Sequence, residues 1–145
     1  MSDYGPYDGG PLVHEHGEPP RFVGSACRHC GATAFPPRRR CAECARTDLE
    51  AVPVAPYGRL YSYTVVRVGR PHEATPYAIG VADFPGGIRV LARLSGWATD
   101  GLGSPIGRTV TAGVADPLGR TGDPRADFRL RVLGQDEADS KMERA

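Results

Sequence analysis

The chain has 145 residues with 19 glycines and 14 prolines, while leucine, isoleucine, valine and phenylalanine together make up only 28 residues. This composition excludes a helix bundle, because helices do not tolerate a breaker every few residues, and it excludes a large apolar core. The 18 basic and 17 acidic residues nearly balance, which is atypical of a general polyanion binder. The sequence therefore predicts a small, turn-rich β protein that needs an additional source of stability.

The first segment, residues 1–20, is rich in glycine and proline and is expected to be an irregular tail. His14 and His16 lie inside it and are expected to be solvated rather than to bind metal. The first residues lack the basic and apolar regions of a signal peptide, and no stretch is apolar enough to span a membrane. We therefore expect a cytoplasmic protein, whose cysteines are better explained by metal binding than by disulfides.

All four cysteines lie in the next segment, residues 21–50, as two Cys-x-x-Cys turns at Cys27–Cys30 and Cys41–Cys44. Two such turns can point four thiolates at one ion, in the tetrahedral geometry that zinc favours. Because the protein would fill every coordination position, the zinc is expected to be structural and not catalytic. An iron centre of rubredoxin type and a redox dithiol pair are the alternatives. Residues 51–57, which contain two prolines, are expected to form an extended connector.

A second domain is expected over residues 58–134, where apolar and polar residues alternate with a period of two. Side chains alternate faces along a strand, so each alternating run predicts a half-buried strand. Five such runs are present, at residues 58–68, 77–81, 88–94, 110–114 and 128–132. In the first run, Leu60 is expected to share one face with Ser62, Thr64, Val66 and Val68.

The segments between these runs are predicted loops, notably residues 98–107 and 116–124, which are rich in glycine and proline. Five short strands with one buried face each predict a small barrel, of which the OB-fold is the common five-stranded example. The last segment, residues 135–145, is charged and tolerates a helix, and we expect it to be a loose tail.

The ribbon segment contains the strings Cys27-x-x-Cys30-Gly31, Phe35-Pro36-Pro37-Arg38 and Cys41-x-x-Cys44, and further strings follow over residues 58–66, 76–83 and 87–94. In this combination they resemble the domain-of-unknown-function-35 family. The resemblance implies an all-β chain in which an N-terminal rubredoxin-like zinc ribbon precedes a five-stranded OB-fold barrel. Two features depart from the family: Ala45 stands where the second knuckle usually has glycine, and the usual N-terminal helical segment is replaced by the tail.

The resemblance also implies a partner. Such proteins are similar to non-catalytic accessory subunits of thiolase-superfamily enzymes, namely thiolases, acyltransferases and retro-aldolases that act on acyl-CoA. The sequence itself contains no nucleophile motif or phosphate loop, and no cysteine remains outside the two turns, so no catalytic residue is assigned. The expected assembly is a hetero-oligomer in which this chain supports the enzyme and helps to seat the acyl-CoA.

Phe35 and Arg38 are the candidate substrate-binding residues, in a cleft expected between ribbon and barrel. Arg38 belongs to the densest cluster of charge, Arg38–Arg40, and could bind the phosphates of coenzyme A. A solvated arginine turn is the alternative for this cluster. Phe35 could stack on a ligand, although filling the small core of the ribbon is the simpler role.

Two other functions compete with the accessory subunit. Arginines and tyrosines alternate along the predicted strands, as they do in OB barrels that bind single-stranded nucleic acid. Near-neutral charge and acidic residues such as Asp83, Asp127 and Glu73, which could neutralise the arginines, count against this function. A free-standing acyl-CoA-binding module without an enzyme partner is the third possibility.

Overall fold

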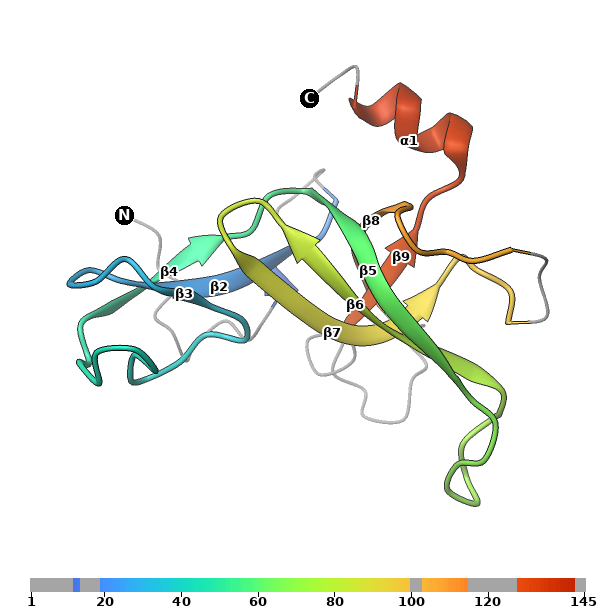
Figure 1. Ribbon diagram of the computed structural model, residues 1–145, viewed down its shortest axis with the longest axis horizontal. Helices are drawn as coiled ribbons and strands as arrows, with labels where there is room; N and C mark the ends of the chain where they lie inside the picture. The colour runs from blue at the N-terminus through green and yellow to red at the C-terminus, as the bar shows by residue number, and fades with distance from the viewer. Residues whose placement is uncertain (1–11, 14–18, 100–102, 115–127, 143–145) are drawn as a thin grey trace.

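The computed structural model describes residues 12–13, 19–99, 103–114 and 128–142, which form a small N-terminal sheet followed by a closed β-barrel (Figure 1). This arrangement confirms the predicted all-β fold. Within these described residues, no helix is long and apolar enough to cross a membrane. The predicted tail around His14 and His16 and the predicted loop over residues 116–124 lie outside the described residues.

The N-terminal sheet is organised around one long strand. This strand is β2 (Arg21–Cys27), and it pairs antiparallel with β1 (Leu12–Val13), β3 (Thr33–Ala34) and β4 (Leu49–Pro53). β1 forms inside the segment that we expected to be an irregular tail, because Leu12 is buried in the core beside its register partner Phe22. β4 extends to Pro53, so the first three residues of the expected connector, 51–53, belong to this sheet.

The barrel closes in the order β5-β6-β7-β9-β8, and all its pairings are antiparallel except that of β7 with β9. Its strands are β5 (Tyr57–Val66), β6 (Tyr77–Phe84), β7 (Ile88–Ser95), β8 (Thr109–Val114) and β9 (Phe128–Val132). All five predicted strands are therefore present. Every second residue of β6 is buried, as the period-two pattern predicts for a strand with one face on the core.

A β-bulge in β5 changes which of its residues face the core. The register of β5 against β6 shifts between Leu60 and Ser62, and Tyr61 and Ser62 are both exposed. Leu60 is buried, but beyond the bulge the alternation reverses and Tyr63 packs against the core. The prediction that Ser62 and Thr64 share the face of Leu60 is therefore wrong.

A single hydrophobic core joins the sheet to the barrel. Phe22 of β2 is 1% exposed, and its ring meets those of Phe35, Phe84 and Phe128 edge to face, with centroids 5.1, 5.6 and 5.7 Å away. Phe84 lies on β6 and Phe128 on β9. The central strand of the N-terminal sheet thus contributes directly to the core of the barrel.

Close backbone contacts also hold the sheet against the barrel. A Cβ on Gly24 would lie 2.7 Å from the carbonyl oxygen of Ala34 and 3.2 Å from Cδ1 of Ile88, so β2 needs glycine here. The hydroxyl of Thr33 donates a hydrogen bond to the carbonyl oxygen of Gly86, in the turn between β6 and β7, at 2.9 Å. These contacts fix the position of the cysteine-bearing loops relative to the barrel.

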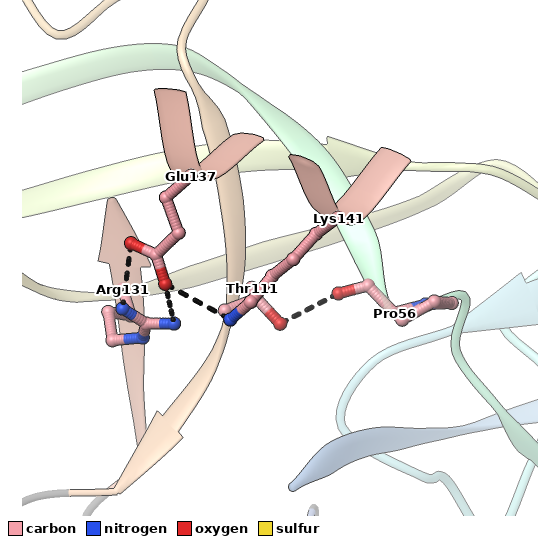
Figure 2. Close-up of polar contacts among 5 residues, drawn as sticks. All are labelled: Pro56, Thr111, Arg131, Glu137 and Lys141. Atoms are coloured by element: carbon pink, nitrogen blue, oxygen red, sulfur yellow. Dashed lines mark hydrogen bonds and ion pairs between the residues drawn. The ribbon is translucent and has the colours of Figure 1, made fainter. Parts of the chain in front are cut away.

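The segment expected to be a loose tail contains the helix α1 (Gln135–Met142). Glu137 accepts hydrogen bonds from Arg131 of β9 at 3.0 and 3.4 Å and from Lys141 at 3.0 Å (Figure 2). The Arg131 guanidinium, and then Lys141, lower the pKa of Glu137 to about 2. Ala138 is buried, so the helix is held by packing as well as by charge. Sequence reasoning missed this helix because its support comes from β9, outside its own segment.

Candidate metal centre and adjoining cleft

The four cysteines come together at the end of the sheet. Their Sγ atoms all lie within 4.8 Å of one another, with 3.6 Å between those of Cys27 and Cys44 and 3.5 Å between those of Cys30 and Cys41. A tetrahedral zinc ion with Zn–S bonds of about 2.3 Å requires sulfur atoms about 3.8 Å apart. The thiolate set therefore fits zinc without rearrangement of the fold.

Two tight turns aim the sulfur atoms. In the first, the amide of Gly31 donates to the carbonyl of Cys27 at 2.9 Å, and Gly31 has a φ of 75°. In the second, the amide of Ala45 donates to the carbonyl of Cys41 at 3.0 Å, and Ala45 has a φ of 61°. Each turn ends in the left-handed region, which glycine adopts freely and alanine only with strain. The departure of Ala45 from the family pattern therefore places a strained residue in the second knuckle.

Backbone amides stabilise the thiolate form of Cys27 and Cys41. The amide of Cys30, more than any other contact, lowers the pKa of the Cys27 thiol to about 7. In the second turn the amide of Cys44 likewise lowers the pKa of Cys41. Hydrogen bonds to the thiolate favour the charged form, which is the form that binds metal. The four protein ligands complete a tetrahedral shell, so the site is a structural zinc site without a coordination position for substrate.

A cleft of about 240 Å³ lies next to the metal centre, between the N-terminal sheet and the barrel. Both candidate substrate-binding residues, Phe35 and Arg38, lie on its wall, together with Cys41. The barrel contributes Ile88 and Arg89. Sequence reasoning did not identify these two, because only the docking of the sheet on the barrel brings residues 88 and 89 beside the cysteine loops.

Phe35 and Arg38 differ in how much of the side chain is available. The ring of Phe35 packs against the core and meets Phe22 and Phe128 edge to face, so filling the core is its main structural role. Arg38 is exposed, its backbone amide donates to the hydroxyl of the buried Ser25 at 3.1 Å, and no described carboxylate forms an ion pair with its side chain. Arg38 is thus a cation with a fixed backbone and an uncommitted head group.

Three of the arginines that alternate along the predicted strands are paired with carboxylates in the structure. Arg89 pairs with Asp83 at 2.6 Å and lowers the pKa of that carboxyl by hydrogen bonding, while Arg93 pairs with Glu73 at 2.8 Å. Arg131 is bound by Glu137, as described above. Asp127, the third acidic residue weighed against nucleic acid, lies outside the described residues. Charges neutralised within the chain contribute little to phosphate binding.

Comparison with known proteins finds relatives among enzyme subunits. The benzoylsuccinyl-CoA thiolase subunit BbsA of Thauera aromatica is 35% identical over 80 residues, which are 55% of this chain and 56% of that protein. A DUF35 domain-containing scaffold protein of Methanocaldococcus jannaschii is 31% identical over 76 residues, or 50% of this chain and 54% of that protein. The match therefore spans little more than half the length of these curated relatives.

A solved structure shares the fold over more of the chain. The Ltp2-ChsH2(DUF35) aldolase aligns with a TM-score of 0.60 and 27% identity, covering 77% of this chain and 84% of that one. Two family models match as well: the ChsH2 rubredoxin-like zinc ribbon domain over residues 14–50 and the ChsH2 C-terminal OB-fold domain over residues 51–114. Because these two domains together cover residues 14–114 and the ribbon model includes all four cysteines, the chain belongs to the ChsH2-type DUF35 family of zinc-ribbon and OB-fold proteins.

Proposed function

We propose that this protein is a non-catalytic accessory subunit of a thiolase-like enzyme that acts on acyl-CoA. The observation that carries the proposal is its similarity to a protein named as a thiolase subunit and to a chain of the Ltp2-ChsH2(DUF35) aldolase. The similarity to a scaffold protein agrees with a supporting role. The expected assembly is a hetero-oligomer of this chain with the enzyme subunit.

The distribution of reactive groups supports a role without chemistry of its own. All four cysteines of the sequence belong to the metal centre, so none remains as a free nucleophile. Asp83 and Glu73, which could act as acid or base, are each bound by an arginine. Because the cysteines serve as metal ligands, we assign the protein to the reducing cytoplasm.

The cleft beside the metal centre supports a second part of the proposal, that this chain helps to seat the acyl-CoA. Its apolar wall includes Phe35 and Ile88, and Arg38 supplies an exposed cation. A guanidinium can bind phosphate oxygens through two parallel hydrogen bonds. We assign Arg38 to a phosphate of coenzyme A and Phe35 to the floor against which the ligand rests.

Co-purification tests the accessory role. The affinity-tagged full chain is expressed in the organism that carries the gene, and the proteins captured with it are identified by mass spectrometry. We expect stoichiometric recovery of a thiolase-fold protein. Recovery of the chain as a monomer that binds acyl-CoA alone would favour the free-standing module, and recovery with RNA would favour the nucleic-acid function; either result refutes the accessory role.

Coenzyme A titration into the purified complex tests the cleft. Arg38→Ala is expected to weaken coenzyme A binding about tenfold, the loss typical of a charged hydrogen bond. Arg28→Ala is the matched control, because it removes the same charge from the ribbon at a position outside the lining of the cleft. Equal affinities of wild type and Arg38→Ala would remove Arg38 from the site, while the subunit assignment would stand.

A further inference from the structure

The outer surface of β5, β6 and β7 carries apolar side chains that the barrel core does not use. We call Tyr61, Ile79, Val81 and Leu91 the β5–β7 face. Tyr61 is 60% exposed and Leu91 is 62% exposed. Val81 pairs in register with Leu91 on one side and with Ser62 on the other, so the members lie on neighbouring strands. The bulge in β5 adds Tyr61 to this surface, because it exposes two consecutive residues.

Arginines border the β5–β7 face in fixed positions. The Arg89 guanidinium lies 4.5 Å from the centre of the Tyr61 ring and is bound by Asp83. Arg93 lies 3.7 Å from the centre of the Tyr77 ring and is bound by Glu73. Side chains already held in place lose little conformational entropy when a partner binds. Tyrosine and arginine are also the residue types that dominate binding energy in protein interfaces.

The loop between β5 and β6, residues 67–76, extends this surface away from the N-terminal sheet (Figure 1). Val68 in this loop is 90% exposed. No described carboxylate lies within ion-pair distance of Arg67 or Arg70, whereas Glu73 is committed to Arg93. Because the loop's own carboxylate is engaged by β7, the loop presents positive charge next to exposed apolar surface.

We propose that the β5–β7 face and the 67–76 loop form the surface that docks on the enzyme subunit, and that the enzyme meets it with an apolar patch bordered by carboxylates. This proposal rests on the proposed function. The apolar centre and the neutralised Arg89 and Arg93 disfavour nucleic acid. A second copy of the chain is disfavoured too, because a two-fold interface would place the same surface opposite, and its Asp83 and Glu73 are already bound to arginines.

Substitution on the face gives the first test, in the complex of the full chain with the thiolase-fold protein recovered from the host. We expect Leu91→Asp to raise the Kd of the complex at least about tenfold, as for a central interface residue. Val114→Asp is the matched control, since Val114 is another exposed aliphatic residue but lies at the end of β8, outside the face. The paired change Arg67→Glu and Arg70→Glu is expected to weaken binding and reduce its salt dependence.

Photo-crosslinking gives a second test that does not depend on destabilising the interface. Leu91→p-benzoylphenylalanine is expected to crosslink to the enzyme subunit, and the same substitution at Val114 is expected to give no product. If wild type binds the enzyme but Leu91→Asp binds equally well and position 91 gives no crosslink, the docking surface is refuted and the accessory role stands. If position 91 crosslinks to a second copy of the chain, the surface serves self-association and the proposal is refuted. If wild type captures no thiolase-fold protein, both proposals fail.

Discussion

Removal of the Phe22 ring should destabilise the barrel, although Phe22 lies in the zinc ribbon. The ring is 1% exposed and contacts three other phenylalanine rings. Truncation of a buried phenylalanine to alanine costs about 3–5 kcal/mol, through lost burial and the cavity left behind. One kcal/mol corresponds to about 3 °C in Tm for a chain of this size, so Phe22→Ala should lower the Tm by about 10–15 °C.

Trp97 allows this effect to be measured in the barrel alone. It is the single tryptophan of the chain, packs against the core and meets the ring of Tyr63 edge to face at 5.2 Å. Its fluorescence therefore reports barrel unfolding, while the absorption of cobalt bound to the four cysteines reports the ribbon. We expect both signals to be lost together at the lower temperature. Leu91→Ala is the control, because it truncates a large apolar side chain on the exterior.

An unchanged Trp97 transition in Phe22→Ala, with loss of the cobalt signal at a lower temperature, would refute this reasoning. It would mean that ribbon and barrel unfold independently and that the four phenylalanine rings contribute little to the barrel. The same comparison applies to metal removal. If the core is shared, a strong chelator should lower the Trp97 transition as well as abolish the ribbon.

Three further predictions follow from local geometry. Ala45→Gly should raise the free energy of unfolding by about 0.5–1 kcal/mol in zinc-saturated protein, because the left-handed conformation strains alanine, and urea titration showing no gain would contradict this. Gly24→Ala should cost about 1–3 kcal/mol in the same assay, since its Cβ would clash with the Ala34 carbonyl, and a neutral effect would show that β2 and β3 can separate. Glu137 has a pKa lowered from 4.5 to about 2, so the stabilisation from its ion pairs is fully present above pH 4.5 and is lost as the pH falls toward 2. Glu137→Gln should therefore remove this acid dependence from the helical circular dichroism. A pH profile that is unchanged in Glu137→Gln would exclude Glu137 as its source.

Features that depend on local sequence were predictable, whereas those that depend on distant contacts were not. The Cys-x-x-Cys turns and the period-two strands are local patterns, and both the metal centre and the five strands of the barrel were found from them. The bulge after Leu60 leaves no local signal, since Tyr61 and Ser62 fit a regular strand equally well. Helix α1 is stabilised by the contact between Glu137 and Arg131 of β9, and the charged sequence of the helix alone does not show that contact.

The cleft shows the same limit. Phe35 and Arg38 belong to one string and were predicted to lie in a cleft between ribbon and barrel, and both line the cleft. The part of the lining that the barrel contributes, including Arg89, follows from the docking of Thr33 on the turn at Gly86. A contact between positions more than fifty residues apart cannot be read from periodicity or spacing, because neither pattern records which surfaces meet.

The phenylalanine cluster also has a consequence for the order in which the protein is made. Phe22 is synthesised early, but Phe84 follows only with β6 and Phe128 only with β9, the last strand of the barrel. Domains generally fold as units as the chain emerges from the ribosome. Here the four cysteines emerge well before Phe84 and Phe128, and β2 must keep an apolar side exposed until nearly the whole chain has emerged. Early metal binding would then protect the cysteines from oxidation until Phe84 and Phe128 are available to pack against Phe22.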